Sequence, residues 1–234
     1  MTEKQNKMNK FSFLVSQKQD LKKLAEKVKI CINDYLQEDI DDLLEDLQAY
    51  VFGGAVRDSI ADQTINDVDI AILPRSKNIL IEKLLRKGFK AFDKTNFDIH
   101  KLYECHVIFE PITLYKNEKF IQLIRPTAAK DDDALQQLIS NVDISCCGVS
   151  YAHGNLYENT KDAINHCLQK KFKINFEARM YNKNRLDHRS NKLERRGWQQ
   201  IEEHSKPSSL MTFFQEEKFM HMNYLLERPN NDAS

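Results

Sequence analysis

The sequence predicts an α+β fold in which helices flank a mixed β-sheet, with a helical layer before it and a helical appendage after it. Short strands and helices alternate between residues 49 and 87, and strand-like segments dominate from 89 to 125. Apolar residues recur at helical spacing near both ends. We therefore expect three parts: an N-terminal helical segment (1–46), a head domain (47–175) and a C-terminal helical appendage (176–234).

The N-terminal part is polar through residue 16, which predicts a frayed end. From residue 18 to 46 the apolar spacing predicts two amphipathic helices with a break at Gln37-Glu38-Asp39. These helices could form a packing layer on the sheet or a binding surface, and we favour the packing layer.

The remaining elements follow from local patterns. Pro74 ends a strand where its missing N–H does no harm, and three acidic residues at 131–133 precede an apolar helical stripe. The predicted strands are 49–53, 67–73, 91–92, 99–102, 106–109, 120–124 and 143–151. The predicted helices are 56–62, 77–87, the stretch after 133, 159–168 and 176–197.

Composition limits the class of protein. The 35 basic and 35 acidic residues cancel, so a nucleic-acid partner would have to be bound by local patches. Five cysteines without a CxxC pair fit a reducing compartment, and Cys146 and Cys147 are expected to pack as small apolar residues in a strand. The N-terminus lacks an apolar signal core and no segment has the length of a membrane span, which favours a soluble, cytoplasmic protein.

The stretch from Val51 to Ile72 carries the chemistry. Asp67 and Asp69 flank Val68 in a predicted strand, so both carboxylates face the same side. Two hard oxygen ligands held together suit Mg²⁺, which commonly takes one or two carboxylates plus substrate phosphates. The pair Gly53-Gly54 lets the backbone approach a ligand, and the helix start behind it offers N–H groups to phosphate.

The motif Gly-Gly-x-Val-Arg-Asp-x-Ile followed by Asp-Val-Asp resembles the head domain of CCA-adding enzymes and bacterial poly(A) polymerases, members of the DNA polymerase beta superfamily of nucleotidyltransferases. The similarity is specific from Gly53 to Asp69 and continues more loosely to about Lys173. It implies a nucleotidyltransferase-like fold for the head domain.

The resemblance assigns roles to several residues. Asp67 and Asp69 would be the catalytic carboxylates that hold two Mg²⁺ ions, and Gly53 and Gly54 would hold the β- and γ-phosphates through backbone N–H groups. Arg57 would reach the triphosphate. Asp58 would orient Arg57 or cap a neighbouring group. Asp143 stands where the family contacts the nucleotide sugar and phosphates, although a strand-end cap is an equal alternative.

The family places a third acid on a later strand, where this sequence has Gln122. An amide oxygen can coordinate a metal but brings no charge. A family member that uses Gln, replacement by Glu110 or Asp98, an inactive protein and an alignment shifted by one strand all remain open.

The helix predicted from residue 176 carries basic residues spaced to share one face, which could follow an RNA backbone or form a solvated surface. They are Arg185, Arg189, Lys192 and Arg196. Tyr181 and Trp198 could stack on a base or lie in the core. The histidines show no metal-ligand spacing.

Together these features predict a Mg²⁺-dependent nucleotidyltransferase that uses a ribonucleoside triphosphate, ATP or CTP, and releases pyrophosphate. The expected acceptor is an RNA 3′ end, as in tRNA nucleotidyltransferases and poly(A) polymerases. Since about 60 residues follow the head domain, we expect a reduced enzyme rather than one that synthesises CCA. The alternatives are a non-catalytic nucleotide- or RNA-binding module and transfer to a protein or small-molecule hydroxyl.

Overall fold

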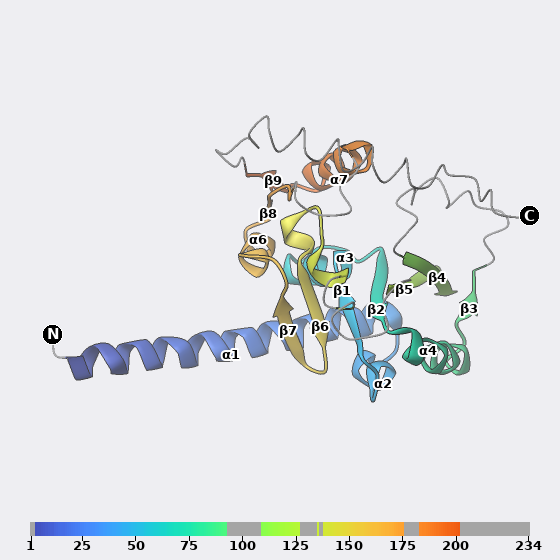
Figure 1. Cartoon of the computed structure of the whole chain (residues 1–234), viewed down its shortest axis with the longest axis horizontal. Helices are drawn as coiled ribbons and strands as arrows, with labels where there is room; N and C mark the ends of the chain where they lie inside the picture. The colour runs from blue at the N-terminus through green and yellow to red at the C-terminus, as the bar shows by residue number, and fades with distance from the viewer. Residues whose placement is uncertain (1–2, 93–108, 127–134, 136–137, 176–182, 202–234) are drawn as a thin grey trace, which may run out of the picture. The chain divides into compact units, whose positions relative to one another are not determined.

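A seven-stranded mixed sheet forms the centre of the computed structural model, which describes residues 3–92, 109–126, 135, 138–175 and 183–201 (Figure 1). The strand order is β3-β4-β5-β2-β1-β6-β7, with β2 and β5 parallel and the other neighbours antiparallel. The strands are β1 (Ala49–Phe52), β2 (Asp67–Ile72), β3 (Lys90–Ala91), β4 (Phe109–Lys116), β5 (Lys119–Pro126), β6 (Val149–Ala152) and β7 (Asn155–Glu158). The predicted α+β class with flanking helices is confirmed.

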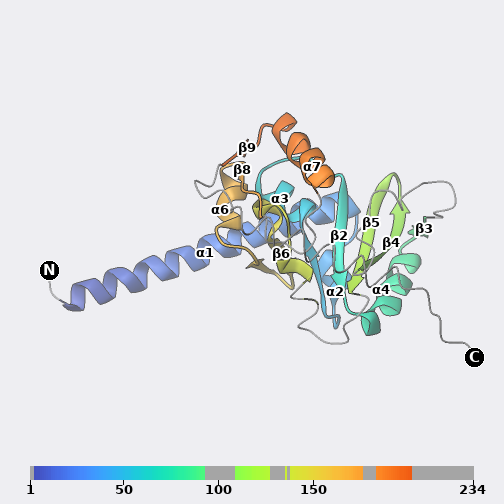
Figure 2. The ribbon, with the colours of Figure 1, turned by 45° about the horizontal axis from the view of Figure 1, so that its top comes forward.

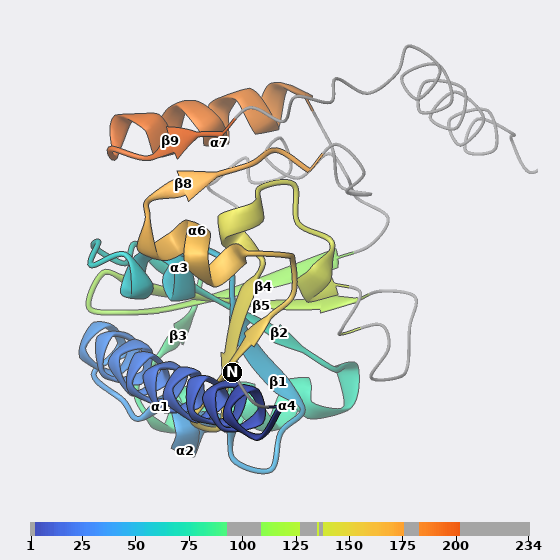
Figure 3. The ribbon, with the colours of Figure 1, turned by 90° about the vertical axis from the view of Figure 1, so that its left-hand side faces the viewer.

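Helices surround this sheet, and a small parallel pair, β8 (Lys171–Phe172) and β9 (Gln199–Gln200), lies beside the last of them. The helices are α1 (Glu3–Leu36), α2 (Ile40–Leu44), α3 (Gly54–Ile60), α4 (Pro74–Arg86), the 3₁₀ helix η3 (Ser145–Cys147), α6 (Ala163–Leu168) and α7 (Lys183–Arg195). Figure 3 shows α1 and α7 on opposite sides of α3 and α6. None of the helices described here is both long and apolar enough to cross a membrane.

The main hydrophobic core lies on one face of the sheet. Val68 and Ile70 of β2 are fully buried there with Ile121 of β5. Val28 and Ile32 of α1 belong to the same core, which also takes apolar residues from α2, α3, α4 and α6. The predicted packing role of the N-terminal helices is therefore confirmed for the described part of α1 and for α2.

The opposite face of the sheet carries a smaller apolar cluster. Phe52 of β1 and Ala71 of β2 pack there with Leu135, Leu138 and Ile139. Those contacts involve the end of β2, because Ala71 lies near its last residue. The beginning of β2, which holds Asp67 and Asp69, lies on the same face outside this cluster.

The chain divides into two compact units, Met1–Gln200 and Ile201–Ser234. Only Ile201 of the second unit is described. The first unit includes α7, which the sequence analysis assigned to a separate appendage. Residues 99–102 and most of 106–109, both predicted as strands, lie outside the described residues, as does Tyr181.

Several predictions about secondary structure are wrong, including the helix predicted to begin at 159, since α6 begins at Ala163, and the strand predicted to end at 109, since β4 continues to Lys116. The N-terminal helix begins at Glu3, so the segment predicted to be frayed is helical from that residue. The strand predicted over 143–151 is limited to Val149–Ala152, because η3 occupies the preceding residues. Ser145 helps to form this turn, since its hydroxyl accepts the Lys173 N–H at 2.9 Å and its carbonyl accepts the Thr160 hydroxyl at 3.0 Å. The predicted break at 37–39 is confirmed, with Asp39 capping α2.

Candidate active site

Asp67 and Asp69 lie at the beginning of β2, in the middle of the sheet (Figure 2). Both side chains are half-buried, whereas Val68 between them is fully buried in the main core. Because side chains alternate along a strand, the two acids share the face opposite to that core. The sheet therefore holds two carboxylates next to each other at a surface that a ligand can approach.

The neighbouring strand β5 places Gln122 directly opposite Asp69 in the parallel register. On the next strand, Thr113 of β4 is paired with Gln122. Paired residues face the same side, so an amide and a hydroxyl lie in one row with the Asp69 carboxylate. Gln122 thus occupies the position at which the sequence analysis expected a third acid.

Of the two alternative third acids, the structure describes the strand position of one. Glu110 is paired with Arg125, not with Gln122, and Asp98 lies outside the described residues. Within the described segments, no group of three or more His, Cys, Asp and Glu side chains is arranged to hold a metal ion. Among the described residues, Gln122 is the neighbour in the paired row that could add an oxygen ligand, beside oxygens of the substrate or of water.

Tyr35 of α1 holds the beginnings of β2 and β5 together beside the acid pair. Its hydroxyl donates to the Asn66 carbonyl at 2.5 Å and accepts the Phe120 N–H at 3.0 Å. Burial raises the pKa of Tyr35, and the negative charge of Asp67 raises it further against the effect of the Phe120 N–H. The phenol therefore stays neutral and acts as a positioning group. In the sequence, Tyr35 is recognisable only as part of an apolar helical stripe.

Gly53 forms the bend that follows β1 and lies against the acid pair. Its φ of 71° falls in the region that favours glycine, and a Cβ added here would lie 4.0 Å from Asp69 Oδ2. The Gly53 N–H donates to the Val149 carbonyl at 3.2 Å. It is therefore committed to the sheet, which corrects the expectation that it donates to phosphate. Gly54 begins α3.

Arg57 lies behind this bend in a buried site. Its Nε donates to Asp58 Oδ1 at 2.8 Å, and its guanidinium stacks 5.6 Å from the centre of the Trp198 ring. A Cβ on Gly54 would lie 3.7 Å from Arg57 Nη2. Arg57 thus adds a fixed positive charge close to the bend. Because its side chain is buried, it does not extend to the surface where a triphosphate was predicted to meet it. Asp58 orients Arg57, as the sequence analysis predicted, and Trp198 is a core residue.

Cys147 accepts hydrogen bonds from two arginines. Arg57 Nη1 lies 3.2 Å and Arg189 Nη2 lies 3.5 Å from its sulfur atom. A hydrogen bond with Cys146 and the two guanidinium groups lower the pKa of Cys147 to about 5, against the opposing effects of burial and Asp143. Both cysteines are buried in the main hydrophobic core, as predicted, although they lie in η3 and not in a strand, and the two guanidinium groups give Cys147 a charged environment. Nothing in the pattern of adjacent cysteines signals this environment, because the arginines come from distant segments.

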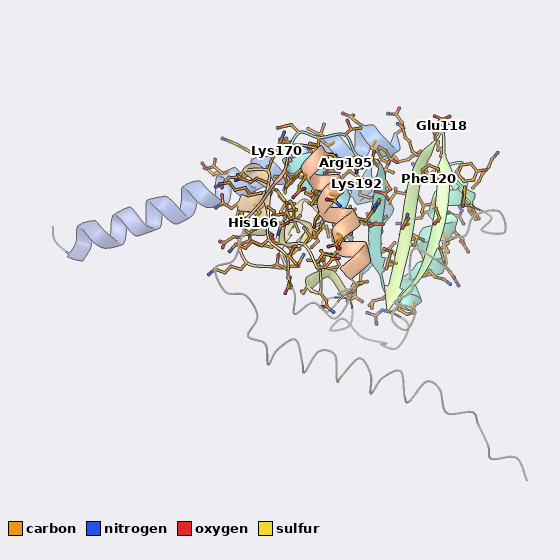
Figure 4. The ribbon with its side chains drawn as sticks, turned by 90° about the horizontal axis from the view of Figure 1, so that it is seen from above. Glu118, Phe120, His166, Lys170, Lys192 and Arg195 are labelled. Atoms are coloured by element: carbon orange, nitrogen blue, oxygen red, sulfur yellow. The ribbon has the colours of Figure 1, made fainter. Side chains whose placement is uncertain are left out.

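The basic residues of α7 separate into two groups. Arg189 forms an ion pair with the buried Asp143, and Arg196, just after the helix, pairs with Asp58 Oδ2 at 3.0 Å. These two arginines hold α7 against the head domain, so they do not belong to a solvent-facing stripe. Lys192 is exposed, together with Arg195, which the sequence analysis placed beside the stripe (Figure 4). The side chain of Arg185 lies outside the described part.

The contacts of Asp143 anchor neighbouring segments of the chain. Its carboxylate accepts from Arg189, and its carbonyl accepts the Asn175 N–H at 2.8 Å. The carboxylate is buried and paired with Arg189, whereas the sequence predicted either a nucleotide contact or a strand-end cap for it. A nucleotide contact by Asp143 would require the Arg189 ion pair to open.

A comparison with protein-family models matches residues 22–170 to the model described as "Gabija anti-defense 2 family protein". No curated protein matches the sequence. Among solved structures, a CCA-adding enzyme in complex with CTP is similar, with 14% identity and a TM-score of 0.52 over 89% of this chain and 47% of that one. A Thermotoga maritima CCA-adding enzyme complexed with tRNA has 14% identity and a TM-score of 0.51, over 78% and 42%.

The chain thus spans less than half the length of these structural relatives. At this level of identity the likeness shows a nucleotidyltransferase-like fold and leaves the activity to be argued from the site.

Proposed function

The chain belongs to the Gabija anti-defense 2 family, and from the geometry of its acid pair we propose that it is a Mg²⁺-dependent nucleotidyltransferase. In this proposal it transfers a nucleotide from a ribonucleoside triphosphate, ATP or CTP, to a hydroxyl and releases pyrophosphate. An RNA 3′ end is the first candidate for the acceptor. The structural relatives described in complex with CTP and with tRNA agree with this choice of partners.

The observation that carries the proposal is the position of Gly53 next to Asp69. Asp67 and Asp69 share one face of β2, and Phe52 is paired with Asp69, so the chain turns at Gly53 immediately beside the acids. A side chain at residue 53 would narrow the approach to the Asp69 carboxylate. A bare backbone bend and two carboxylates at one surface form an arrangement suited to a metal-bound triphosphate.

The donor set fits Mg²⁺. The Asp67 and Asp69 carboxylates are hard oxygen ligands, and the Gln122 amide can add a neutral oxygen from the opposite strand. Bound Mg²⁺ would neutralise charge on the triphosphate and favour ionisation of the attacking hydroxyl. Phosphate oxygens of the substrate would complete the coordination.

The other residues act on the substrate through position and charge. The N–H groups that begin α3 at Gly54 lie on the β1 side of the acid pair, where the β- and γ-phosphates would bind. Arg57 supports them with a buried positive charge that Asp58 holds in place. The triphosphate would thus be oriented with its leaving group towards the bend, and the acceptor hydroxyl would approach the α-phosphorus from the β5 side.

The test is an incorporation assay with labelled ribonucleotides, Mg²⁺ and RNA. The family description points to a second set of acceptors, the components of Gabija defence, which the assay should include. We expect wild type to label one acceptor and the pair Asp67→Asn and Asp69→Asn to abolish labelling. Asp46→Asn is the matched control, because Asp46 is exposed and its φ of 60° suits asparagine. Labelling that survives in the double variant would contradict the proposal.

A second function, nucleotide or RNA binding without catalysis, is favoured by one observation. Gln122 occupies the register position opposite Asp69, and it can neither carry a charge nor accept a proton from the acceptor. A binding module would retain Mg²⁺-dependent affinity for a triphosphate, lost in the double variant, with no labelling of RNA, protein or small-molecule acceptors. Transfer to a protein or small molecule would instead appear as labelling of that acceptor alone.

A further inference from the structure

A hollow of about 870 Å³ lies at the β3–β4–β5 edge of the sheet. Three aromatic rings line it, and they pack against one another with centroids 5.9 Å apart for Phe92 and Tyr115, 6.0 Å for Phe92 and Phe120, and 6.4 Å for Tyr115 and Phe120. Volumes of this order are usual for sites that take a small organic ligand. The apolar rings suit a flat, unsaturated group.

This hollow shares a face of the sheet with the acid pair. Tyr115 is paired with Phe120, and Phe120 is paired with Asp67, so the three residues form one row across β4, β5 and β2. Side chains of paired residues face the same side. Neighbouring strands lie about 4.8 Å apart, which places Tyr115 roughly 10 Å from Asp67 along this row. Figure 4 shows Phe120 near the start of β5, on the flank of β2 away from α7.

The charged residues at the rim of the hollow leave one side on which a polynucleotide backbone could lie. Lys90 extends the row, since it is paired with Tyr115, and it is exposed. Lys116 is already held by Glu38 at 2.7 Å, and Glu118 is an exposed acid at the same rim. A phosphate backbone would therefore run along the Lys90 side and avoid Glu118.

The direction of the reaction selects the ligand. Phe52 is paired with Asp69 and Gly53 follows it, so a triphosphate oriented by the bend at Gly53 and Gly54, as in the proposed function, would have its leaving group on the β1 side of Asp69. In-line displacement requires the attacking hydroxyl to come from the opposite side, which is the β5 side. The aromatic hollow lies on that side, beginning with Phe120 on the neighbouring strand β5, and therefore on the acceptor side of the site.

We propose that the hollow lined by Phe92, Tyr115 and Phe120 binds the terminal nucleobase of a single-stranded polynucleotide acceptor and so presents its 3′ hydroxyl to Asp67 and Asp69. This inference rests on the proposed function for the chemical step. There the 3′ oxygen forms a bond to the α-phosphorus, the bond from the α-phosphorus to the bridging oxygen breaks, pyrophosphate leaves with the electron pair, and the hydroxyl proton passes to solvent.

The first test measures binding without any transfer, by fluorescence anisotropy of a single-stranded RNA oligonucleotide against the same oligonucleotide with an abasic 3′ end. Base stacking on aromatic side chains predicts roughly tenfold tighter binding of the intact oligonucleotide to wild type. The double variant Phe92→Leu and Tyr115→Leu should bind the two oligonucleotides alike. Tyr157→Leu is the matched control, since Tyr157 is an exposed tyrosine at the other edge of the sheet, and it should keep the difference.

The remaining outcomes separate this inference from its rivals. Equal binding of intact and abasic RNA by wild type would overturn it. A hollow that binds a tyrosine-containing peptide and does not bind the RNA base would also overturn it. In the transfer assay the double variant should have a higher KM for the oligonucleotide and an unchanged KM for the triphosphate. A higher KM for the triphosphate alone would assign the hollow to the incoming nucleotide and overturn the inference. Base-dependent binding in a protein that never transfers a nucleotide would support the hollow and refute the proposed function.

Discussion

Gln122 of β5 lies directly opposite Asp69 of β2, with Thr113 of β4 next in the same row. This register places a neutral amide where a third carboxylate would complete a charged metal site. If the chain is the transferase proposed above, this amide would limit both the affinity for Mg²⁺ and the ability of the site to take a proton from an acceptor hydroxyl. The proposed function therefore makes the rate of transfer sensitive to this one side chain.

Gln122→Glu tests that dependence. Glutamate matches glutamine in size, and the added charge next to Asp69 should tighten Mg²⁺ binding and raise transfer by roughly a hundredfold or more, the lower end of the range for a positioned general base. The measurement is the rate of labelled-nucleotide incorporation as a function of Mg²⁺ concentration. Thr113→Ser, which keeps a hydroxyl in the same row, is the control and should leave the Mg²⁺ dependence unchanged. Weaker Mg²⁺ binding by the Gln122→Glu variant would show that the third position does not face the metal.

Gly53→Ala should harm both stability and the site. The backbone at Gly53, with φ of 71° and ψ of −125°, strains any side chain by about 1–3 kcal/mol, and the added methyl group would lie 4.0 Å from Asp69 Oδ2. Gly154→Ala is a close control, because Gly154 has a φ of 72° with open space around the added Cβ. Thermal unfolding should show similar losses for the two variants. Mg²⁺-dependent triphosphate binding should fall only in Gly53→Ala, and equal binding by both variants would remove Gly53 from the site.

Cys147 should make stability depend on pH. The folded protein lowers the pKa of this thiol to about 5 from its ordinary value of 9.0. The unfolded chain then holds more protons between these values, so the thiolate contributes stability that is fully present above pH 9 and is lost as pH falls through about 5. Cys147→Ala leaves Arg57 and Arg189 without this partner, at a cost of about 1–3 kcal/mol near neutral pH.

The measurement is urea unfolding of wild type and Cys147→Ala from pH 5 to 9. The difference in the free energy of unfolding should grow with pH. Cys31→Ala is the control for the loss of a thiol elsewhere in the fold, since Cys31 lies on α1 and is only half-buried. A flat difference for Cys147→Ala would mean that the thiol remains protonated.

The two groups of basic residues on α7 should respond differently to substitution. Lys192→Ala with Arg195→Ala should leave thermal stability unchanged and reduce the salt slope of RNA binding, by roughly 0.7 per lost phosphate contact to a single strand. Arg86→Ala removes an exposed charge from α4 and serves as the control. An unchanged salt slope in the α7 variant would argue against an RNA contact there.

Arg196→Ala should instead lower stability. It removes the ion pair with the buried Asp58 and the hydrogen bond to the Thr64 carbonyl, both at 3.0 Å. Asp58 keeps Arg57 as a partner, so we expect a loss of about 1–3 kcal/mol rather than complete unfolding. Differential scanning fluorimetry gives the size of the loss. A melting temperature equal to that of wild type would show that this contact does not hold α7 in place.

The local sequence by itself determined the elements around the site. Alternating apolar and acidic residues defined β2 and the shared face of Asp67 and Asp69, and the adjacent glycines marked the bend after β1. These features depend on residues close together in the chain. The same holds for the break between α1 and α2, where Asp39 caps the second helix.

Only the tertiary structure decided which partners these residues meet. In the sequence, Arg57, Cys147 and Arg189 belong to three separate patterns, and their contacts form because α3, η3 and α7 pack together. Likewise, a strand pattern does not fix its register, so the row that joins Tyr115, Phe120 and Asp67 could not be read before the strands were paired. Long-range packing sets these contacts, because the free energy of burying charges and rings depends on the groups that surround them in space.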